Sequence, residues 1–320
     1  MFKRIRTSIA ILLALVLALV IIILVSESPL QAFYLFLLGP LRNFRYIGNV
    51  IELAIPLIFS GLATAILFRS NLFNLGAEGI FYISGLAAAV IAIKVPIASP
   101  FIHPLLAIIT GTVVGMMVGA VPGYLKAKLD ASELVSSLML NSILAGVGLF
   151  ILNHFIRDKN ITEIASLRFP DSANLPRIIP GTRIHFGIVI ALVMVLLIFL
   201  FFKYHKQGYL LKMFGLNRHF TEFSGFSSSK LIILAHLLAG ALAGMGGSIE
   251  VLGMHDRFRW ADLPGLGFDG ALVAMLAQNN PVSVLFAALF LAYIRTGADI
   301  MARQGDVANE MVYIIQAVII

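Results

Sequence analysis

The sequence predicts an all-α protein, a polytopic membrane helix bundle of about ten transmembrane spans, and three observations lead to this class. Of the 320 residues, 60% are hydrophobic and 12% are charged, whereas a soluble domain carries about 25% charge. The mean hydropathy is +0.98, and apolar runs recur from one end of the chain to the other. Two of these runs are interrupted by glycine-rich stretches that also hold a carboxylate. A water-exposed surface cannot be built from this composition.

Ten apolar segments make up the predicted bundle, which we treat as one transmembrane domain over residues 1–320. The first, 9–25, follows three basic residues and mimics a signal peptide. It is long for one and no Ala-x-Ala-like site follows, so we expect a retained span. A span needs about 20 residues, and we expect the shorter C-terminal span, 308–320, to be truncated. The ten segments are 9–25, 47–67, 80–93, 104–125, 132–152, 184–202, 230–252, 271–278, 282–301 and 308–320.

Local features support the middle of this series. Segment 104–125 carries glycine at every fourth position of one face, which allows a neighbouring helix to approach closely. The polar stretch 153–183 contains three prolines and predicts the longest excursion outside the membrane. The loop 203–229 is basic and returns the chain to the opposite side.

Basic residues set the expected orientation. They cluster at 3–6, 126–128 and 203–230, and positive residues in short loops mark the cytoplasmic side, so we expect a multi-pass protein with a cytoplasmic N-terminus. The net charge of +7 fits contact with anionic lipid, and we expect no nucleic-acid partner. The chain has no cysteine, no phosphate-binding loop and no His-Glu-x-x-His helix. We therefore expect no disulfide, no metal site and no cofactor bound by this chain.

The first interrupted stretch, Arg69-Ser-Asn-Leu-Phe-Asn-Leu-Gly-Ala-Glu-Gly79, joins two apolar segments with little hydrophilic sequence between them. Irregular backbone near membrane depth is tolerated only where protein buries it or where it lines a wet cavity. An ionisable group there indicates function. The substrate-path candidates of this stretch are Phe73, Asn74, Glu78 and, just beyond it, Phe81. The alternative is an interfacial turn with Glu78 as a cap on the helix that follows.

A second stretch, Gly265-Leu-Gly-Phe-Asp-Gly270, repeats the order glycine, acid, glycine before a helix of small residues. Paired glycine-interrupted segments in the two halves of a transporter indicate a midplane substrate site, so Phe268 and Asp269 join the substrate-path candidates. Aromatic faces stack planar ligands, although nearby Trp260 equally fits an interfacial anchor. Two roles stay open for Glu78 and Asp269: capping a helix end, or accepting hydrogen bonds from ligand hydroxyls.

The loop 213–226 is more patterned than a connector needs. Gly215 and Gly225 bracket a short amphipathic turn that presents Phe220 and Phe223. A short helix with exposed aromatic residues fits the groove of a partner protein. A helix that lies on lipid headgroups is the alternative.

Four motifs together resemble one known family: Phe73-Asn-Leu-Gly-Ala-Glu-Gly79, Glu133-Leu-Val-Ser-Ser-Leu-Met-Leu-Asn141, Gly215-Leu-Asn217 with Ser224-Gly225, and Gly267-Phe-Asp-Gly-Ala-Leu-Val-Ala274 through Asn280-Pro281. In this order they resemble the permease subunit of bacterial ABC importers for nucleosides and simple sugars. This family is shared with ribose-type and branched-chain amino acid permeases. The resemblance runs from about residue 47 to the C-terminus.

The resemblance implies a permease domain of the bacterial plasma membrane that is no enzyme itself. Transport would be driven by ATP on two separate ATPase subunits. A second permease subunit, a paralogue, and an extracytoplasmic substrate-binding lipoprotein would complete the importer. The family docks the matching loop on the ATPase, which here implies Gly215, Asn217, Phe220, Phe223, Ser224 and Gly225. The loop departs from the family pattern at Arg218-His219-Phe220-Thr221, where Pro-Glu-Ala-Ala is usual, and this leaves open which ATPase it accepts.

We expect the cargo to be nucleosides. Two alternatives stay open: a permease for simple sugars, and a secondary transporter that works alone on an ion gradient. The secondary transporter would need a buried charge relay. For such a relay the spans offer little beyond Glu52, Glu78, Glu250, Asp269 and Arg295.

Overall fold

The computed structural model describes residues 16–17, 19–20, 22–23 and 26–305. Over these residues the regular structure is helical. Within them, β-structure is limited to two isolated bridges, which pair Arg157 with Ser166 and Arg177 with His185. The predicted all-α class is confirmed.

Seven helices of the described chain are long and apolar enough to cross a membrane. Each coincides with one predicted segment, and the ends differ by a few residues. The seven are α3 (Phe44–Arg69), α4 (Ala77–Lys94), α5 (Ile102–Leu129), α6 (Glu133–Ile151, extended by the π-helical turn η2, Leu152–Ile156), α7 (Gly187–Tyr204), α10 (Ser228–Met254) and α12 (Pro281–Gln304). The shorter helices are α2 (Pro29–Leu38), η1 (Gly39–Leu41), η3 (Asp171–Ala173), α8 (Lys206–Leu216), α9 (Arg218–Phe223) and α11 (Leu266–Leu276).

The predicted count of about ten spans is not confirmed. Segment 9–25 lies largely, and segment 308–320 entirely, outside the described residues. Segment 271–278 falls on α11, which has 11 residues and is too short to cross a bilayer alone, since a span needs about 20. The described residues therefore support seven membrane spans, and the higher count stays a prediction.

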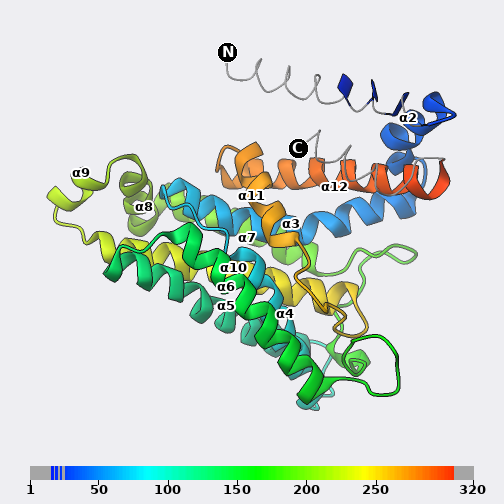
Figure 1. Ribbon diagram of the computed structural model, residues 1–320, viewed down its shortest axis with the longest axis horizontal. Coiled ribbons are helices and arrows are strands. Elements are labelled where there is room, and N and C mark those ends of the chain that lie inside the picture. The colour runs from blue at the N-terminus through cyan, green and yellow to red at the C-terminus, as the bar shows by residue number, and fades with distance from the viewer. Residues whose placement is uncertain (1–15, 18, 21, 24–25, 306–320) are drawn as a thin grey trace. The chain divides into compact units, whose positions relative to one another are not determined.

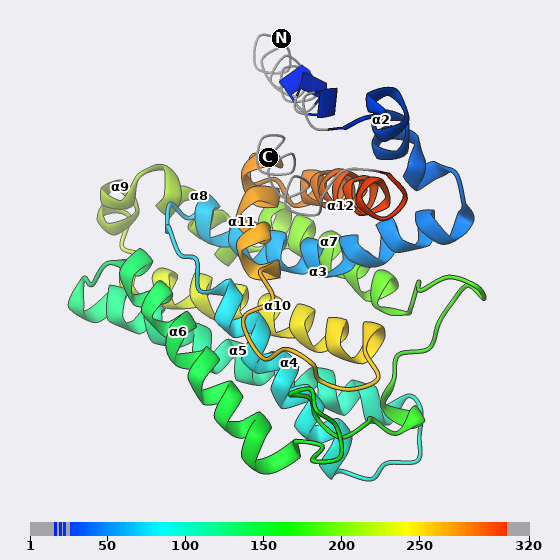
Figure 2. The ribbon, with the colours of Figure 1, turned by 45° about the vertical axis from the view of Figure 1, so that its right-hand side comes forward.

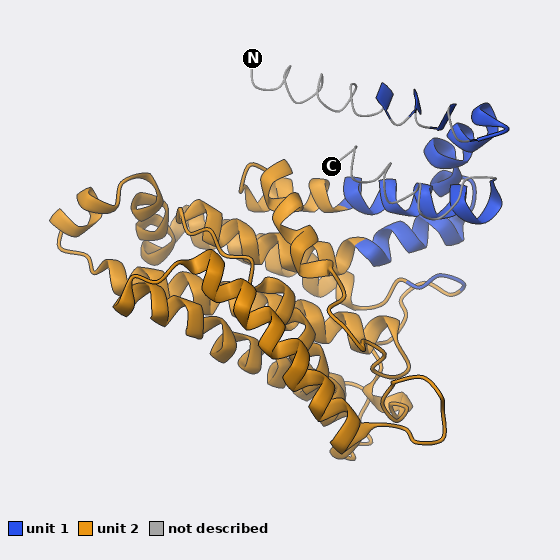
Figure 3. Cartoon of the chain, viewed as in Figure 1, with its two compact units in different colours: residues 1–53, 181–183, 289–320 blue, residues 54–180, 184–288 orange. Residues whose placement is uncertain are grey.

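The chain divides into two compact units, coloured in Figure 3. Unit 1 comprises residues 1–53, 181–183 and 289–320, and unit 2 comprises residues 54–180 and 184–288. Helices α3 and α12 each contribute residues to both units. Both interrupted stretches and the patterned loop belong to unit 2.

Unit 1 contains α2, a short apolar helix that the sequence analysis missed because it has only 10 residues. Its residues Leu35 and Phe36 are buried against the second half of α12. At Gly297 of α12, an added Cβ would meet the backbone carbonyl of Phe36. Only glycine therefore lets α2 approach α12 this closely.

Unit 2 is built around α4, α5 and α10, which lie side by side (Figure 1 and Figure 2). The glycine face of α5 meets α10: a Cβ at Gly115 would lie 2.5 Å from the carbonyl oxygen of Gly240. A Cβ at Gly119 would lie 2.9 Å from the Cα atom of Gly240. Side chains larger than hydrogen do not fit at such distances, so the predicted packing role of this glycine face is confirmed.

Residues 157–180 belong to the long polar excursion that the sequence predicts, and they pack on the loop that follows α10. The N–H of Ser166 donates to the carbonyl of Phe258, and the N–H of Phe258 donates to Ser166 Oγ, each at 2.9 Å. Arg257 Nη1 lies 3.4 Å from Asp158 Oδ2, and both side chains are largely buried. These bonds fix the loop that leads into the second interrupted stretch.

His185, which precedes α7, makes the fold sensitive to acid. Its ring is fully buried beside Gly253, and Nδ1 accepts the N–H of Gly187 at 3.2 Å. Burial, together with the positive charge of Arg177, lowers the pKa of His185 from 6.5 to about 4. Between about pH 6.5 and about pH 4, His185 is therefore neutral in the folded protein and protonated in the unfolded chain. Stability is complete above the unfolded pKa and falls as the pH drops from about 6.5 towards about 4.

We expect protonation of His185 to remove at most about 3.5 kcal/mol of stability, at about 1.4 kcal/mol per pH unit. The measurement is the melting temperature of the detergent-solubilised protein between about pH 7 and about pH 4.5. The control variant is His185→Asn, which keeps an acceptor for the N–H of Gly187 and cannot titrate. The wild type should lose more thermal stability than the variant over this range, and parallel losses would contradict the assignment.

Candidate functional site

We call the two interrupted stretches, residues 69–79 and 265–270, the first and the second break. The first break joins α3 to α4, and side chains of α6 provide hydrogen-bond partners for its backbone. The N–H of Phe73 donates to Glu133 Oε2 at 2.9 Å, and the N–H of Leu75 donates to Ser137 Oγ at 3.2 Å. Asn141 Nδ2 donates to the carbonyl of Leu75 at 3.0 Å. The three α6 residues stand four positions apart and so share one helix face. They provide the hydrogen bonds that water would otherwise make to backbone groups left unpaired by any helix or sheet.

Asn141 also caps the start of α4. Gly79, the third residue of α4, donates its N–H to Asn141 Oδ1 at 2.9 Å. The first N–H groups of a helix have no partner within it, and this bond satisfies one of them. A Cβ at Gly79 would lie 2.8 Å from the Cα atom of Asn141, and glycine is what admits α6 at this point. Two of the motifs that carry the family resemblance thus hydrogen-bond to each other.

Glu78 connects the first break to the second. Its side chain is fully buried, and its carboxylate accepts three backbone N–H groups at the start of α11. These come from Gly265 at 2.5 Å, Gly267 at 2.6 Å and Phe268 at 3.0 Å. A helix leaves such N–H groups unsatisfied, and its N-terminal dipole favours a negative charge. The helix end that Glu78 caps is therefore that of α11, and not that of α4, in which Glu78 lies.

Two glycines allow this close meeting. Gly265 has φ of +81°, a conformation that glycine adopts without steric cost. At Gly267, an added Cβ would lie 2.6 Å from the carbonyl carbon of Ala77 and would also meet the backbone of Glu78. Backbone atoms cannot rotate away as a side chain can. The glycines of the second break thus bring its N–H groups within reach of the carboxylate.

The structure brings some substrate-path candidates together. Glu78, Phe268 and Asp269 meet at the first turn of α11, where Glu78 and Asp269 are buried and Phe268 is 38% exposed. Phe81 is fully buried nearly one turn further along α4. Its ring centroid lies 5.9 Å from that of Trp260, so Trp260 packs on α4 just beyond the first break.

The other two candidates lie away from this meeting point. Asn74 is buried, and its Oδ1 accepts the N–H of Gly76 at 2.6 Å. Phe73 is 52% exposed and stacks on Phe68 with ring centroids 5.1 Å apart. Phe73 lines a cavity together with Phe214 of α8 and Arg218 of α9, and so lies apart from the meeting point at Glu78.

Sequence reasoning did not select Ser137 and Asn141 as site residues, although both lie in a motif that it quoted. Their spacing of four after Glu133 is the signal that could have found them. It also missed Phe258, which is buried with its ring 5.7 Å from Tyr82. No sequence pattern indicates that contact.

The patterned loop 213–226 folds as the end of α8 followed by α9. Asn217 Oδ1 accepts the N–H of Phe220 at 2.9 Å and so caps α9. Phe220 is 57% exposed and Phe223 is 91% exposed. Helix α9 thus presents two aromatic rings to the outside of this chain.

The end of α9 is also well defined. Ser224 Oγ donates to the carbonyl of Phe220 at 2.8 Å. Gly225 has φ of +84°, and the N–H of Phe226 then reaches back to the carbonyl of Thr221 at 3.2 Å. Glycine at this turn lets the chain leave α9 and enter α10.

Both sides of α9 are held in place. Glu222 Oε1 accepts Ser228 Oγ of α10 at 2.6 Å and Arg218 Nε at 3.1 Å. These hydrogen bonds lower the pKa of Glu222, so the carboxylate is charged at neutral pH. On α8, an added Cβ at Gly215 would meet the carbonyl of Arg69, and this close contact seats α8 on the end of α3.

A cavity of ≈490 Å³ is shared by the first break and the α8–α9 region. Phe73 and Glu133 contribute to its wall from the first break and α6, and Phe214 and Arg218 contribute from α8 and α9. Lys126 also lines it, with Nζ 3.7 Å from Glu133 Oε1. The carboxylate that holds the first break thus faces the same space as the patterned loop.

Comparison with known proteins places this arrangement in context. A family model described as branched-chain amino acid transport system / permease component matches residues 46–320. The chain is 34% identical to the guanosine ABC transporter permease protein NupP of Bacillus subtilis, over 98% of this chain and 90% of that protein. It is 30% identical to the nucleoside ABC transporter permease protein NupB of Lactococcus lactis subsp. cremoris, over 92% and 83% respectively. It is 29% identical to the glucose ABC transporter permease protein TsgB13 of Haloferax volcanii, over 98% and 84%. No solved structure matches.

Proposed function

The chain belongs to the branched-chain amino acid transport system permease family, and from that we propose that it is the membrane-spanning permease subunit of an ABC importer for nucleosides. The match over residues 46–320 carries this proposal, because it takes in both breaks and the patterned loop. The chain itself is a multi-pass membrane protein. In this proposal residues 1–320 act as one permease domain that is no enzyme, and ATP binds to separate ATPase subunits.

Nucleosides are the cargo that the relatives favour. Two of them are named as permeases for guanosine or for nucleosides. A second candidate is a simple sugar, favoured by the relative named for glucose. Membership of an ABC permease family weakens the alternative of a secondary transporter that works alone.

The partners follow from the same family. An importer permease works with an ATPase and with a binding protein that delivers the cargo. We propose that α9 faces the cytoplasm with the N-terminus and docks on one of two ATPase subunits through Phe220 and Phe223. A paralogous permease subunit pairs with this chain, and an extracytoplasmic lipoprotein delivers the nucleoside. The exposure of both rings and the fixed ends of α9 support its docking role.

The two breaks line the substrate path in this proposal. The Glu78 carboxylate already accepts three backbone N–H groups. This favours a role as a helix cap over direct contact with the ligand. Phe268 and Asp269 lie at the same turn of α11, and Phe81 lies on α4 nearly one turn beyond Glu78. The path would therefore be shaped by the joined breaks and not by a charge offered to the cargo.

The first expected outcome concerns energy coupling. The purified chain alone in liposomes should show no ATP-driven nucleoside uptake, because it has no phosphate-binding loop. The same chain assembled with its ATPase subunits, second permease and binding protein should take up labelled nucleoside when ATP is supplied. Strong uptake by the lone chain on an ion gradient would refute the proposal and favour a secondary transporter.

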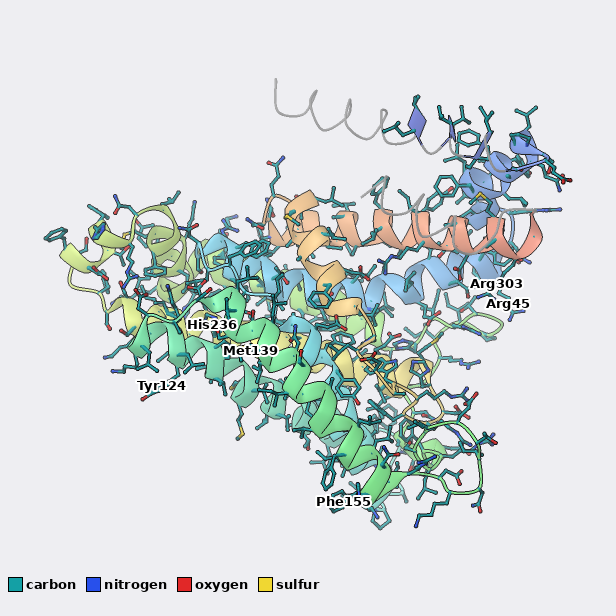
Figure 4. All side chains as sticks on the ribbon, in the orientation of Figure 1. Arg45, Tyr124, Met139, Phe155, His236 and Arg303 are labelled. Carbon is teal, nitrogen blue, oxygen red and sulfur yellow. The ribbon has the colours of Figure 1, made fainter. Side chains whose placement is uncertain are left out.

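The second expected outcome concerns the docking helix. Replacing Phe220 and Phe223 with Ala should release the ATPase on purification and leave membrane insertion unchanged. Burial of each ring in a partner groove is worth about 1.5–3 kcal/mol. The matched control is Phe155→Ala, which removes a ring that is 60% exposed on η2 (Figure 4). If the ATPase co-purifies equally with all three proteins, α9 is not the docking element.

A further inference from the structure

A small cavity lies within unit 2, where the first break meets α5 and α10. Its volume is ≈10 Å³, which is room for about one water molecule. Its wall is formed by Leu67, Asn74, Ala77, Ile80, Gly119, Pro122, His236, Ala239 and Gly240. Of these residues, Asn74 and His236 alone carry polar side chains.

His236 presents a hydrogen-bond acceptor at this cavity. The residue, labelled in Figure 4, is 2% exposed, and its Nδ1 lies 2.9 Å from the carbonyl oxygen of Ile232. A carbonyl oxygen only accepts, so Nδ1 carries the proton and Nε2 of the neutral ring is an acceptor. Nε2 is buried and has no hydrogen-bond partner among the residues that the structure describes. Gly123 of α5 makes room for the ring, since a Cβ there would lie 2.8 Å from His236 Cγ.

Asn74 presents the complementary donor. Its side chain is 2% exposed, and Oδ1 accepts the N–H of Gly76 at 2.6 Å. The other terminal atom is therefore the amide nitrogen, which has two N–H groups to donate. Nδ2 is buried, and no partner for it occurs in the described part of the chain. Buried polar groups are nearly always satisfied by protein or by ordered water.

We propose that Asn74 Nδ2 and His236 Nε2 bind one buried water molecule, and that this water links the first break to α10. Asn74 donates to the water oxygen, and the water donates to His236 Nε2. The other side chains of the wall are apolar, so the two polar side-chain atoms define where the water is held. The donor, the acceptor and the volume of the cavity all fit a single water.

The position of this water gives it a role in transport, which rests on the proposed function. Helix α10 begins at Ser228, whose hydroxyl holds Glu222 of the docking helix α9 at 2.6 Å. His236 follows about two turns later on the same helix. Asn74 lies four residues before Glu78, which caps α11. The water thus connects α10, which is hydrogen-bonded to α9, with the first break, which is hydrogen-bonded to α11. Through these contacts it transmits a movement of α9 to the substrate path.

The first test is a structure of the assembled importer at a resolution that shows ordered water. We expect a density peak within hydrogen-bond distance of both Asn74 Nδ2 and His236 Nε2. A dry cavity, or a direct bond between the two side chains, would overturn the water site. This result does not depend on which cargo the importer moves.

The second test uses variants that differ in which atom they keep. His236→Asn retains a group at the Nδ1 position and loses Nε2, whereas His236→Gln places an amide at the Nε2 position. Asn74→Asp keeps the acceptor for the N–H of Gly76 and replaces the donor by an acceptor. The control is His154→Asn, because His154 Nδ1 also bonds a carbonyl four residues earlier, at 3.0 Å, but is exposed.

The measured quantity is the amount of nucleoside taken up per ATP hydrolysed by the assembled importer in liposomes. His236→Asn and Asn74→Asp should lower this ratio about tenfold, which corresponds to about 1.4 kcal/mol. His236→Gln and His154→Asn should stay within about twofold of the wild type. Equal ratios for all variants would overturn the link, whereas a wild type without nucleoside uptake would overturn the proposed function instead. If a variant fails to assemble, the density at the cavity decides.

Discussion

Replacing Glu78 with Gln should lower nucleoside uptake by the assembled importer by at least about tenfold. The carboxylate accepts three backbone N–H groups at the start of α11. The amide has a single oxygen, and its NH₂ group would point a donor at other donors. At least one buried N–H is then left unpaired, at a cost of about 1–3 kcal/mol. The start of α11 should loosen from the first break, and the substrate path should lose its shape.

The control for charge is Asp262→Asn, which neutralises an exposed carboxylate that caps no helix, on the loop before α11. Uptake of labelled guanosine and of deoxyguanosine separates the two roles that remain open for Glu78. If Glu78 caps α11, uptake of both compounds should fall by the same factor. If Glu78 binds ligand hydroxyls, guanosine should be affected more. Wild-type uptake by the Gln variant would remove Glu78 from the mechanism.

Replacing Gly267 with Ala should destabilise the permease and lower uptake. The new Cβ would lie 2.6 Å from the carbonyl carbon of Ala77 and would meet the backbone of Glu78. Overpacking of this kind costs about 1–3 kcal/mol and sometimes more. Because the obstacle is backbone, the two breaks must separate to relieve it, and the cap on α11 is then stretched or lost.

The matched control is Gly146→Ala on α6, where no atom lies within 4 Å of the added Cβ. Alanine is favoured over glycine inside a helix by about 0.5–1 kcal/mol, so this variant should melt at the wild-type temperature or slightly above it. The measurements are the melting temperature in detergent and the uptake rate after reconstitution. Equal melting temperatures for the two variants would show that the breaks do not pack as described.

Much of the fold follows from local sequence. Seven spans are visible as apolar runs, because a helix in lipid must be apolar over its whole crossing. The helix α2 was missed because its 10 residues are too few for a span. The glycine face of α5 predicts a close helix contact, but only the structure shows that α10 provides it.

The candidate site is less predictable, because its central contact joins distant parts of the chain. The pattern of glycine and acid marks both breaks, and local reasoning assigns a cap to the helix that each acid begins. The carboxylate of Glu78 instead reaches Gly265, 187 positions away. No periodicity in a single sequence indicates such a pair. The same limit applies to Asn74 and His236, which have no shared pattern and meet only at the wall of one cavity.

Uptake of labelled guanosine by the assembled importer in liposomes tests the central claim most directly. The chain is reconstituted with its ATPase subunits, second permease and binding protein, and uptake is followed with and without ATP. We predict ATP-dependent uptake of guanosine that excess unlabelled nucleoside abolishes and excess glucose does not affect. Uptake that glucose abolishes and nucleosides leave unchanged would contradict the assignment of nucleosides as the cargo.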